Sequence, residues 1–180
     1  MQKIQSPLSP PKQNLLLAFT GSVATIKDLK LLTLLQATSQ FNIKVLHTQN
    51  ALFFTKITET EKLNFPQIEF FTEKDEWAWK KKGDRVLHIY LRDWASCLLI
   101  SPLSAQTLAK ISQGMCDNVL TLILRAWKYT KDLKIVKPVL VCPAMNSDMW
   151  AHPVTSSQVK MLKEWGFFYV GPIEKVLVCK

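Results

Sequence analysis

Short apolar runs and stretches with helical periodicity alternate along most of the chain. The apolar runs have the length of buried strands and cover residues 14–20, 41–48, 68–72, 96–101, 138–142 and 167–171. Between them, apolar residues recur at helical spacing, which predicts helices. The predicted helices cover residues 23–39, 104–114, 115–130 and 152–166, and one or two further helical turns follow residue 49.

This alternation predicts an open parallel sheet with helices on both faces, the three-layer α/β arrangement of Rossmann-like and flavodoxin-like folds. We assign residues 14–180 to a single domain of this kind. Residues 1–13 contain three prolines and no apolar run, so we expect a flexible N-terminal tail. In such sheets, ligands bind beyond the carboxyl ends of the strands. Those ends carry hydroxyls and amides here, in segments 20–22, 47–50, 101–107 and 143–150.

The residues at these strand ends favour a ligand that carries a phosphate. Helix N-termini with small hydroxyl residues bind phosphate, and two of the segments lead directly into helices. The turn Thr20-Gly21-Ser22 has one glycine where the dinucleotide motif GxGxxG needs three, and no GxxxxGK[ST] sequence is present. A mononucleotide therefore suits this turn better than a dinucleotide.

Segment 143–150, Pro-Ala-Met-Asn-Ser-Asp-Met-Trp, holds two methionines and an indole that a simple connection does not need. We interpret it as one wall of a ligand pocket. The alternative is a tight strand-to-helix junction padded by methionine and tryptophan.

The net charge of +9 does not by itself indicate nucleic-acid binding. The basic residues are scattered, and the one dense run, residues 79–85, lies next to the acidic residues 73–76. No nucleic-acid-binding motif accompanies that run, so we expect no nucleic-acid partner. A positive field would instead attract small anionic substrates.

No apolar run is long enough to span a bilayer, and the N-terminus lacks the apolar core of a signal peptide. We therefore expect no membrane partner and a cytoplasmic location. The four cysteines, at 97, 116, 142 and 179, form no CxxC pair and have no histidine at metal-ligand spacing. This pattern predicts no metal site, no disulfide framework, and buried free thiols at the first three positions.

Six segments resemble, in the same order, those of the phosphopantothenoylcysteine decarboxylases, a family of flavoproteins that decarboxylate a terminal cysteine. They are GSVA, LHIYLRDWA, SPLSAQTLAKISQGMCDNVLT, RAWKYT, PAMNSDMWAHPVT and VLVC. The resemblance runs from about residue 14 to residue 179, and PxMNxxMW is its most specific part. It implies FMN at the strand ends, in sites completed between the subunits of a homotrimer. The implied reaction converts phosphopantothenoylcysteine to phosphopantetheine in coenzyme A biosynthesis.

The resemblance also implies roles for individual residues. His88 matches the family's catalytic histidine, and Cys179 matches the proton donor of the reductive half-reaction. Asn146 matches the residue that binds the substrate's carboxylate region, and Met149 matches a residue that shapes the substrate pocket. Without the resemblance, His88 would be interpreted as an inward-facing polar residue on a strand.

The resemblance assigns FMN binding to residues from four of the strand ends. They are Gly21, Ser22, Val23, Thr48, Ser104, Ala105, Gln106, Thr107 and Ala144. Ser104 and Thr107 could also cap their helix, and the two roles use the same geometry. Asp117 and Asn118 are expected to support the site or to contact another subunit.

The sequence departs from the family pattern at several positions. Asp93 stands where the family has a second basic residue, Gln106 where asparagine is usual, and Ser96 where aspartate is common. After Cys179 the sequence lacks the Gly-Asp-x-Gly-x-Gly flap of the family, which we expect to weaken substrate closure.

These departures keep open an alternative, a catalytically impaired flavin-binding subunit that regulates a phosphatase or completes a mixed trimer. The basic composition, without an acidic extension, disfavours the phosphatase role. A third hypothesis is a decarboxylase of peptides that end in cysteine. The segment Glu-Lys-Asp-Glu-Trp at 73–77 favours the coenzyme A enzyme over this hypothesis.

Overall fold

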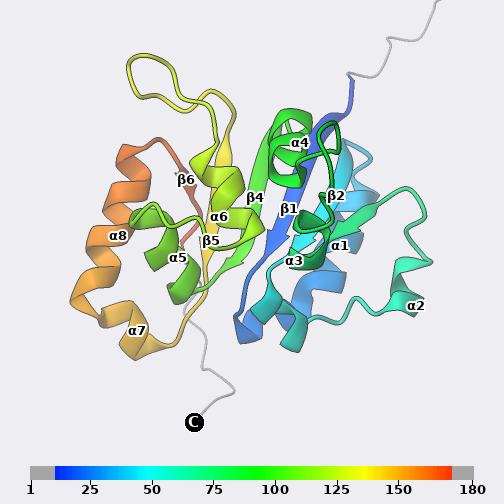
Figure 1. Cartoon of the computed structure of the whole chain (residues 1–180). Helices are drawn as coiled ribbons and strands as arrows, with labels where there is room; N and C mark the ends of the chain where they lie inside the picture. The colour runs from blue at the N-terminus through cyan, green and yellow to red at the C-terminus, as the bar shows by residue number, and fades with distance from the viewer. Residues whose placement is uncertain (1–10, 172–180) are drawn as a thin grey trace, which may run out of the picture.

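The computed structural model describes residues 11–171 and contains one six-stranded sheet whose strand pairs are all parallel. The strand order is β3-β2-β1-β4-β5-β6 (Figure 1). The strands are β1 (Gln13–Phe19), β2 (Phe41–His47), β3 (Glu69–Phe71), β4 (Cys97–Leu103), β5 (Val139–Pro143) and β6 (Phe168–Tyr169). The predicted parallel α/β sheet is thus confirmed, and β1 begins one residue earlier than expected.

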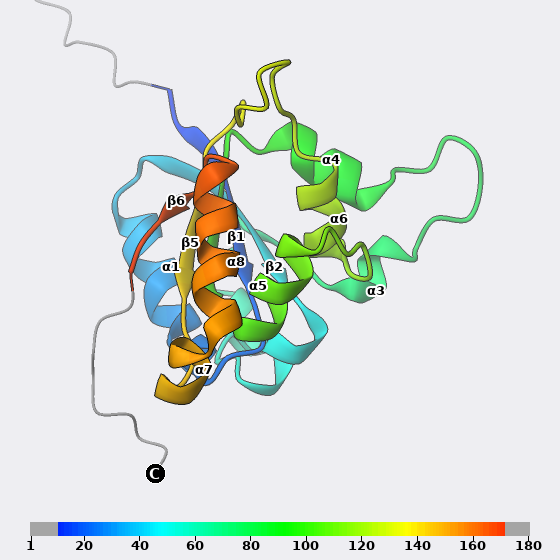
Figure 2. The ribbon, with the colours of Figure 1, turned by 90° about the vertical axis from the view of Figure 1, so that its left-hand side faces the viewer.

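Helices cover both faces of the sheet, as Figure 2 shows from the side. One face carries α4 (Leu87–Trp94), α5 (Ala105–Ser112), α6 (Val119–Arg125) and α8 (Pro153–Glu164). The opposite face carries α1 (Asp28–Ala37) over β1 and β2. The short helices are η1 (Val23–Lys27), η2 (Gln49–Phe53), α2 (Glu59–Lys62), α3 (Glu73–Glu76) and α7 (Ser147–Ala151).

The core divides into two apolar clusters, one on each face of the sheet. Successive side chains of a strand point to opposite faces. In β1, Leu16 and Ala18 therefore join the cluster under α4, α5, α6 and α8, while Leu15, Leu17 and Phe19 join the cluster under α1. This two-sided burial explains the unbroken apolar run that marks β1 in the sequence. On the α1 face, Leu140 of β5 is only half-buried.

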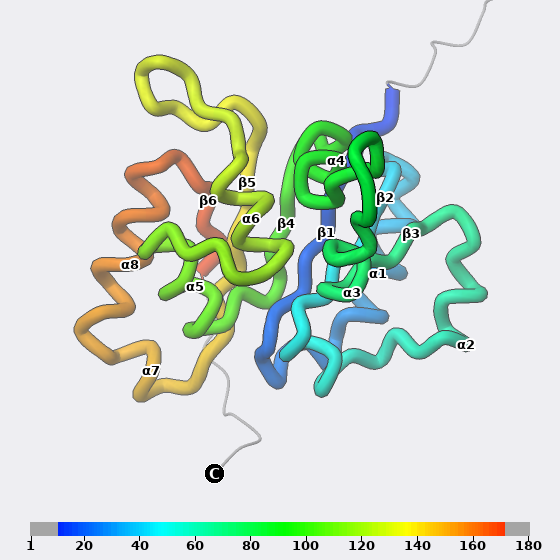
Figure 3. Tube along the Cα trace, in the orientation of Figure 1, coloured from blue at the N-terminus to red at the C-terminus, as the bar shows by residue number. Residues whose placement is uncertain are grey.

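The chain reverses its direction of winding between β1 and β4, which lie side by side in the middle of the sheet (Figure 3). After β1 the chain runs outward to β2 and β3, and it then returns to β4 and continues to β5 and β6 on the other side. Loops that leave neighbouring strands in opposite directions open a crevice at their carboxyl ends. This reversal point positions the candidate site.

Two predicted helices differ from those in the structure. The stretch 23–39 divides into η1 and α1, and the stretch 115–130 forms a helix only over α6. Helix α6 starts later than predicted for a local reason. Gly114 adopts a left-handed φ of 68°, and Asn118 caps α6 through a capping box with Thr121. Cys116 lies in this turn and is exposed, so the prediction of a buried thiol there is wrong.

The other two described cysteines, Cys97 and Cys142, are half-buried free thiols, and burial raises the pKa of both. Residues 11–171 contain no helix that is long and apolar enough to cross a bilayer. Within the same residues, no group of three His, Cys, Asp or Glu side chains is arranged to hold a metal ion.

Candidate functional site

A polar cleft of about 300 Å³ lies at the reversal point, where β1, β2 and β4 end. Its lining residues come from the predicted strand-end segments and from α3, α5 and the turn before α6. They are Gly21, Thr48, Gln49, Asn50, Glu73, Trp77, Gln106, Thr107, Lys110, Asp117 and Asn118. Four of the predicted FMN-binding residues thus line one cleft.

Hydrogen bonds between strand ends hold the walls of the cleft together. The Thr20 hydroxyl donates to the Pro102 carbonyl oxygen at 2.7 Å and accepts from the Ser104 backbone N–H at 2.8 Å. The Ser22 hydroxyl donates to the Ala144 carbonyl oxygen at 3.0 Å. These bonds fix the turns after β1, β4 and β5 relative to one another. They also bring Ser22 and Ala144, both predicted to bind FMN, into direct contact.

Gly21 is required by the close approach of a neighbouring turn. A Cβ atom at this position would lie 2.5 Å from Cβ of Asn50. The Asn50 side chain in turn donates from Nδ2 to Oε1 of Gln106 at 2.8 Å. The longer side chain at position 106, a departure from the family pattern, is therefore accommodated by a partner across the cleft.

The N-terminus of α5 offers free hydrogen-bond donors at this cleft. Ser104 caps the helix by accepting from the Thr107 N–H at 3.2 Å. Within residues 11–171, the backbone N–H groups of Ala105 and Gln106 have no protein acceptor. Such N–H groups, together with the positive end of the helix dipole, favour a phosphate.

The cleft as a whole fits the phosphate and polar edges of FMN. Thr48 and Thr107 add hydroxyls, and Lys110 adds a cation that is paired with Asp117. Hydroxyl, amide and N–H donors match phosphate and ring-carbonyl acceptors. Glu73 lies at the far side, where burial raises the pKa of its carboxyl group although the Val119 N–H donates to it.

Asn146 caps the short helix α7 with its side-chain oxygen and leaves its side-chain nitrogen free. Its Oδ1 accepts from the Met149 N–H at 2.8 Å, and its Nδ2 has no acceptor within the described part of the chain. An amide N–H fixed in this way can orient a carboxylate. Met149 follows on the same helix and is 51% exposed, so it does not serve as core packing within this chain.

His88 lies on α4 and not on a strand, which corrects the interpretation made without the resemblance. Its Nδ1 lies 2.5 Å from Oε1 of Glu76, and its backbone N–H donates to Oε2 of the same carboxylate at 3.0 Å. The Glu76 side chain is buried. A carboxylate on Nδ1 fixes the ring and leaves Nε2 as the nitrogen that can exchange a proton.

Glu76 is a candidate site residue that sequence reasoning missed. The acidic run 73–76 enters the sequence analysis as a neighbour of the basic run and as part of segment 73–77, without a role for Glu76 itself. The pairing of Glu76 with His88 depends on how α3 packs against the start of α4, which periodicity does not reveal.

The structure does not bring all predicted residues together within one chain. His88 is on α4, and Asn146 and Met149 are on α7, at opposite ends of the molecule in both Figure 1 and Figure 2. Val23 is half-exposed at the start of η1. Cys179 lies outside the described residues.

Two neighbouring cations partly neutralise the charge of Asp93, the acidic residue that departs from the family pattern. Its carboxylate lies 2.8 Å from the Arg92 guanidinium and 3.8 Å from Lys128 Nζ. Both cations reduce the repulsion that an isolated carboxylate would exert on an anionic substrate. Ser96 accepts a hydrogen bond from the Asn14 N–H at 3.3 Å, which supports a structural role for this position.

Comparisons with known proteins agree with this geometry. The sequence profile of the flavoprotein family matches residues 3–180. Phosphopantothenoylcysteine decarboxylase of Arabidopsis thaliana is 43% identical over 180 residues, covering 99% of this chain and 80% of the relative. The protein of the same name from Mus musculus is 40% identical over 174 residues, with coverages of 96% and 79%.

Two solved structures are similar in fold as well as in sequence. One is a cysteine-to-serine mutant of PPC decarboxylase complexed with pantothenoylaminoethenethiol, with a TM-score of 0.82 and 43% identity over 93% of this chain and 86% of that one. The other is the FMN-binding protein AtHal3, with a TM-score of 0.82 and 42% identity over 94% and 85%.

Proposed function

Because the chain belongs to the flavoprotein family, we propose that it is an enzyme that decarboxylates phosphopantothenoylcysteine to phosphopantetheine with FMN, a step of coenzyme A biosynthesis. The observation that carries the proposal is the cleft at the reversal point, where the free N–H groups of α5 meet the hydroxyls of Thr48 and Thr107. Relatives whose sequences align with nearly the whole chain, at 43% and 40% identity, carry this activity in their names.

The residues of the cleft would hold FMN through its phosphate and its polar edges. The N–H groups of Ala105 and Gln106 would bind the phosphate, with the hydroxyls of Thr48 and Thr107 as further donors. Bound FMN supplies the two-electron oxidation and reduction that removal of the carboxylate from a cysteine requires.

The protein's own residues would orient the substrate and move its protons. Asn146 would direct its free Nδ2 at the substrate carboxylate, and Met149 would border the pocket. His88 would accept the substrate's thiol proton at Nε2, because Glu76 occupies Nδ1. The predicted role of Cys179 as an acid, and the predicted cytoplasmic location, stay predictions.

The proposal includes a homotrimer with sites between subunits. Two observations support it. His88 and Asn146 lie apart within one chain, so a second copy is needed to bring the two together. Large apolar side chains are also exposed around the strand ends, among them Val23, Ile26 and Phe53, and such groups mark contact surfaces.

The test is to incubate the purified, FMN-loaded protein with phosphopantothenoylcysteine and to identify the products by mass. Phosphopantetheine is the expected product, and His88→Asn is expected to abolish turnover while FMN stays bound. Release of the enethiol alone would show that oxidation and decarboxylation proceed and that reduction fails. Recovery of unchanged substrate by an FMN-loaded protein would overturn the proposal in favour of a flavin-binding subunit without activity.

A further inference from the structure

Helix α3 is held rigidly although it is only four residues long. Thr72 and Asp75 form a capping box at its start. The Glu73 carboxylate accepts from the Val119 N–H at 3.1 Å and so ties α3 to α6. Glu76 ties its other end to His88 on α4. These contacts therefore hold the residue that follows α3 in a fixed position.

That residue is Trp77, and its side chain is 79% exposed. Within residues 11–171, no aromatic ring or cation stacks on its indole. By contrast, Trp127 is 4% exposed and donates from its indole N–H to a backbone carbonyl oxygen. A rigidly placed but open indole is the arrangement expected of a surface that receives a ligand.

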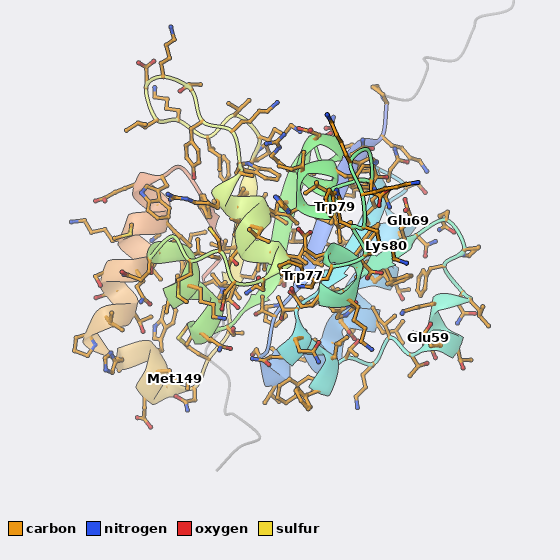
Figure 4. All side chains as sticks on the ribbon, viewed as in Figure 1. Glu59, Glu69, Trp77, Trp79, Lys80 and Met149 are labelled. Atoms are coloured by element: carbon orange, nitrogen blue, oxygen red, sulfur yellow. The ribbon has the colours of Figure 1, made fainter. Side chains whose placement is uncertain are left out.

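Trp77 also lines the proposed FMN cleft, together with Gly21, Thr48 and Gln106. Among the described residues that line this cleft, Trp77 alone has a large apolar side chain. The other lining groups provide hydrogen bonds and charge, which suit a phosphate and polar edges but leave a flat aromatic ring without an apolar contact. Figure 4 labels Trp77 beside α3, well separated from Met149 on α7.

We propose that Trp77 is a flavin-binding residue whose indole packs against the isoalloxazine ring of FMN held in this cleft. The inference rests on the proposed function, because it takes FMN as the ligand of the site. Stacking between aromatic rings adds to affinity beyond simple burial. An indole in contact with a flavin also quenches the flavin's fluorescence, because it donates an electron to the excited ring.

The experiment compares the wild-type protein with Trp77→Ala, Trp77→Phe and a control, Trp79→Ala. Trp79 is two residues away and 50% exposed, and it does not line the cleft. For each protein, the Kd of FMN and the fluorescence lifetime of bound FMN are measured. Since Trp77 is exposed, its replacement is expected to leave the fold intact, which far-UV circular dichroism checks.

Trp77→Ala is expected to weaken FMN binding by about tenfold, as loss of one stacking contact does, and to lengthen the lifetime of the flavin that still binds. Trp77→Phe keeps a flat ring and is expected to retain most of the affinity, yet to lengthen the lifetime, because phenylalanine is a poor electron donor. Trp79→Ala is expected to change neither quantity.

An unchanged Kd and lifetime in Trp77→Ala would overturn the inference while leaving the proposed function in place. Dissociation of the oligomer by this variant, with an unchanged lifetime of bound FMN, would assign Trp77 to a contact with a second copy and would also overturn it. Failure of the wild-type protein to bind FMN would instead overturn the proposed function itself.

Discussion

At the scale of single residues, the chemistry depends on which atoms their neighbours leave free. Asn146 uses Oδ1 to cap α7, so Nδ2 stays available for a ligand. His88 has Nδ1 engaged by Glu76, so Nε2 remains for proton exchange. The family resemblance in the sequence predicted roles for Asn146 and His88. It did not reveal Glu76, because a contact between α3 and α4 leaves no periodic pattern in the sequence.

Replacing Glu76 by glutamine tests this arrangement. Glu76→Gln is expected to lower kcat by on the order of a hundredfold, because an amide no longer fixes the ring nitrogen that carries the proton. KM and the Kd of FMN are expected to change little. The matched control is Glu59→Gln, which alters an exposed carboxylate on α2. Steady-state kinetics and an FMN titration measure both effects, and an unchanged kcat in Glu76→Gln would contradict the role.

At the scale of elements, a buried polar cluster joins the start of α1 to the end of β2. The Asp28 carboxylate lies 3.2 Å from Nε2 of His47 and accepts from the Thr55 hydroxyl and from the Lys56 N–H at 3.1 Å. The cluster fixes the turn after β2 that carries Thr48 and Asn50 into the cleft. The sequence predicted these strands and turns from their apolar pattern. It could not predict that Asp28, in a helical stretch, is buried.

This cluster makes stability depend on pH. Burial acts to raise the pKa of Asp28, but hydrogen bonds from His47, Thr55, Lys56 and Leu29 outweigh it and hold the pKa below its usual value of 3.8. A carboxyl group whose pKa is lowered on folding stabilises the protein above its unfolded pKa. That stability is lost as the pH falls through the folded value.

We therefore expect the Tm to fall more steeply below about pH 4 in the wild-type protein than in Asp28→Asn. At neutral pH, Asp28→Asn is expected to be less stable by about 1–3 kcal/mol, because it loses charge-assisted hydrogen bonds in a buried site. Thermal unfolding followed by circular dichroism across this pH range measures both. Parallel curves for the two proteins would rule out Asp28 as the source of the acid dependence.

At the scale of the whole molecule, the parallel sheet was predictable, since the alternation of apolar runs and helices indicates the fold class. The strand order that places the reversal point between β1 and β4 comes from the structure alone. The gathering of four predicted FMN-binding residues in one cleft was predictable as well, because these residues lie at the strand ends. The separation of His88 from Asn146 was not derivable from the pattern of residues, since it depends on where α4 and α7 lie around the sheet.

Two inactive variants are expected to complement each other if the sites lie between subunits. His88→Asn and Asn146→Ala, co-expressed with different affinity tags and purified through both, would form mixed trimers. In trimers that contain both variants, about one third of the sites would combine an intact His88 with an intact Asn146, one site in each trimer. About that fraction of wild-type activity is expected, whereas each variant alone is expected to be inactive. No recovered activity in doubly tagged trimers would place each site within a single chain.

The hydrogen bonds that hold the walls of the cleft together also determine at what stage of synthesis the chain can bind FMN. Ser22 meets Ala144 across 122 positions of sequence, and Thr20 meets Ser104 across 84. A chain growing on the ribosome exposes its glycine turn early, yet the partner of Ser22 is made only after most of the domain. Recognition of the flavin is therefore expected only after Ala144 has been synthesised. A fragment that ends before Ala144 lacks the partner of Ser22 and is therefore expected to bind FMN poorly.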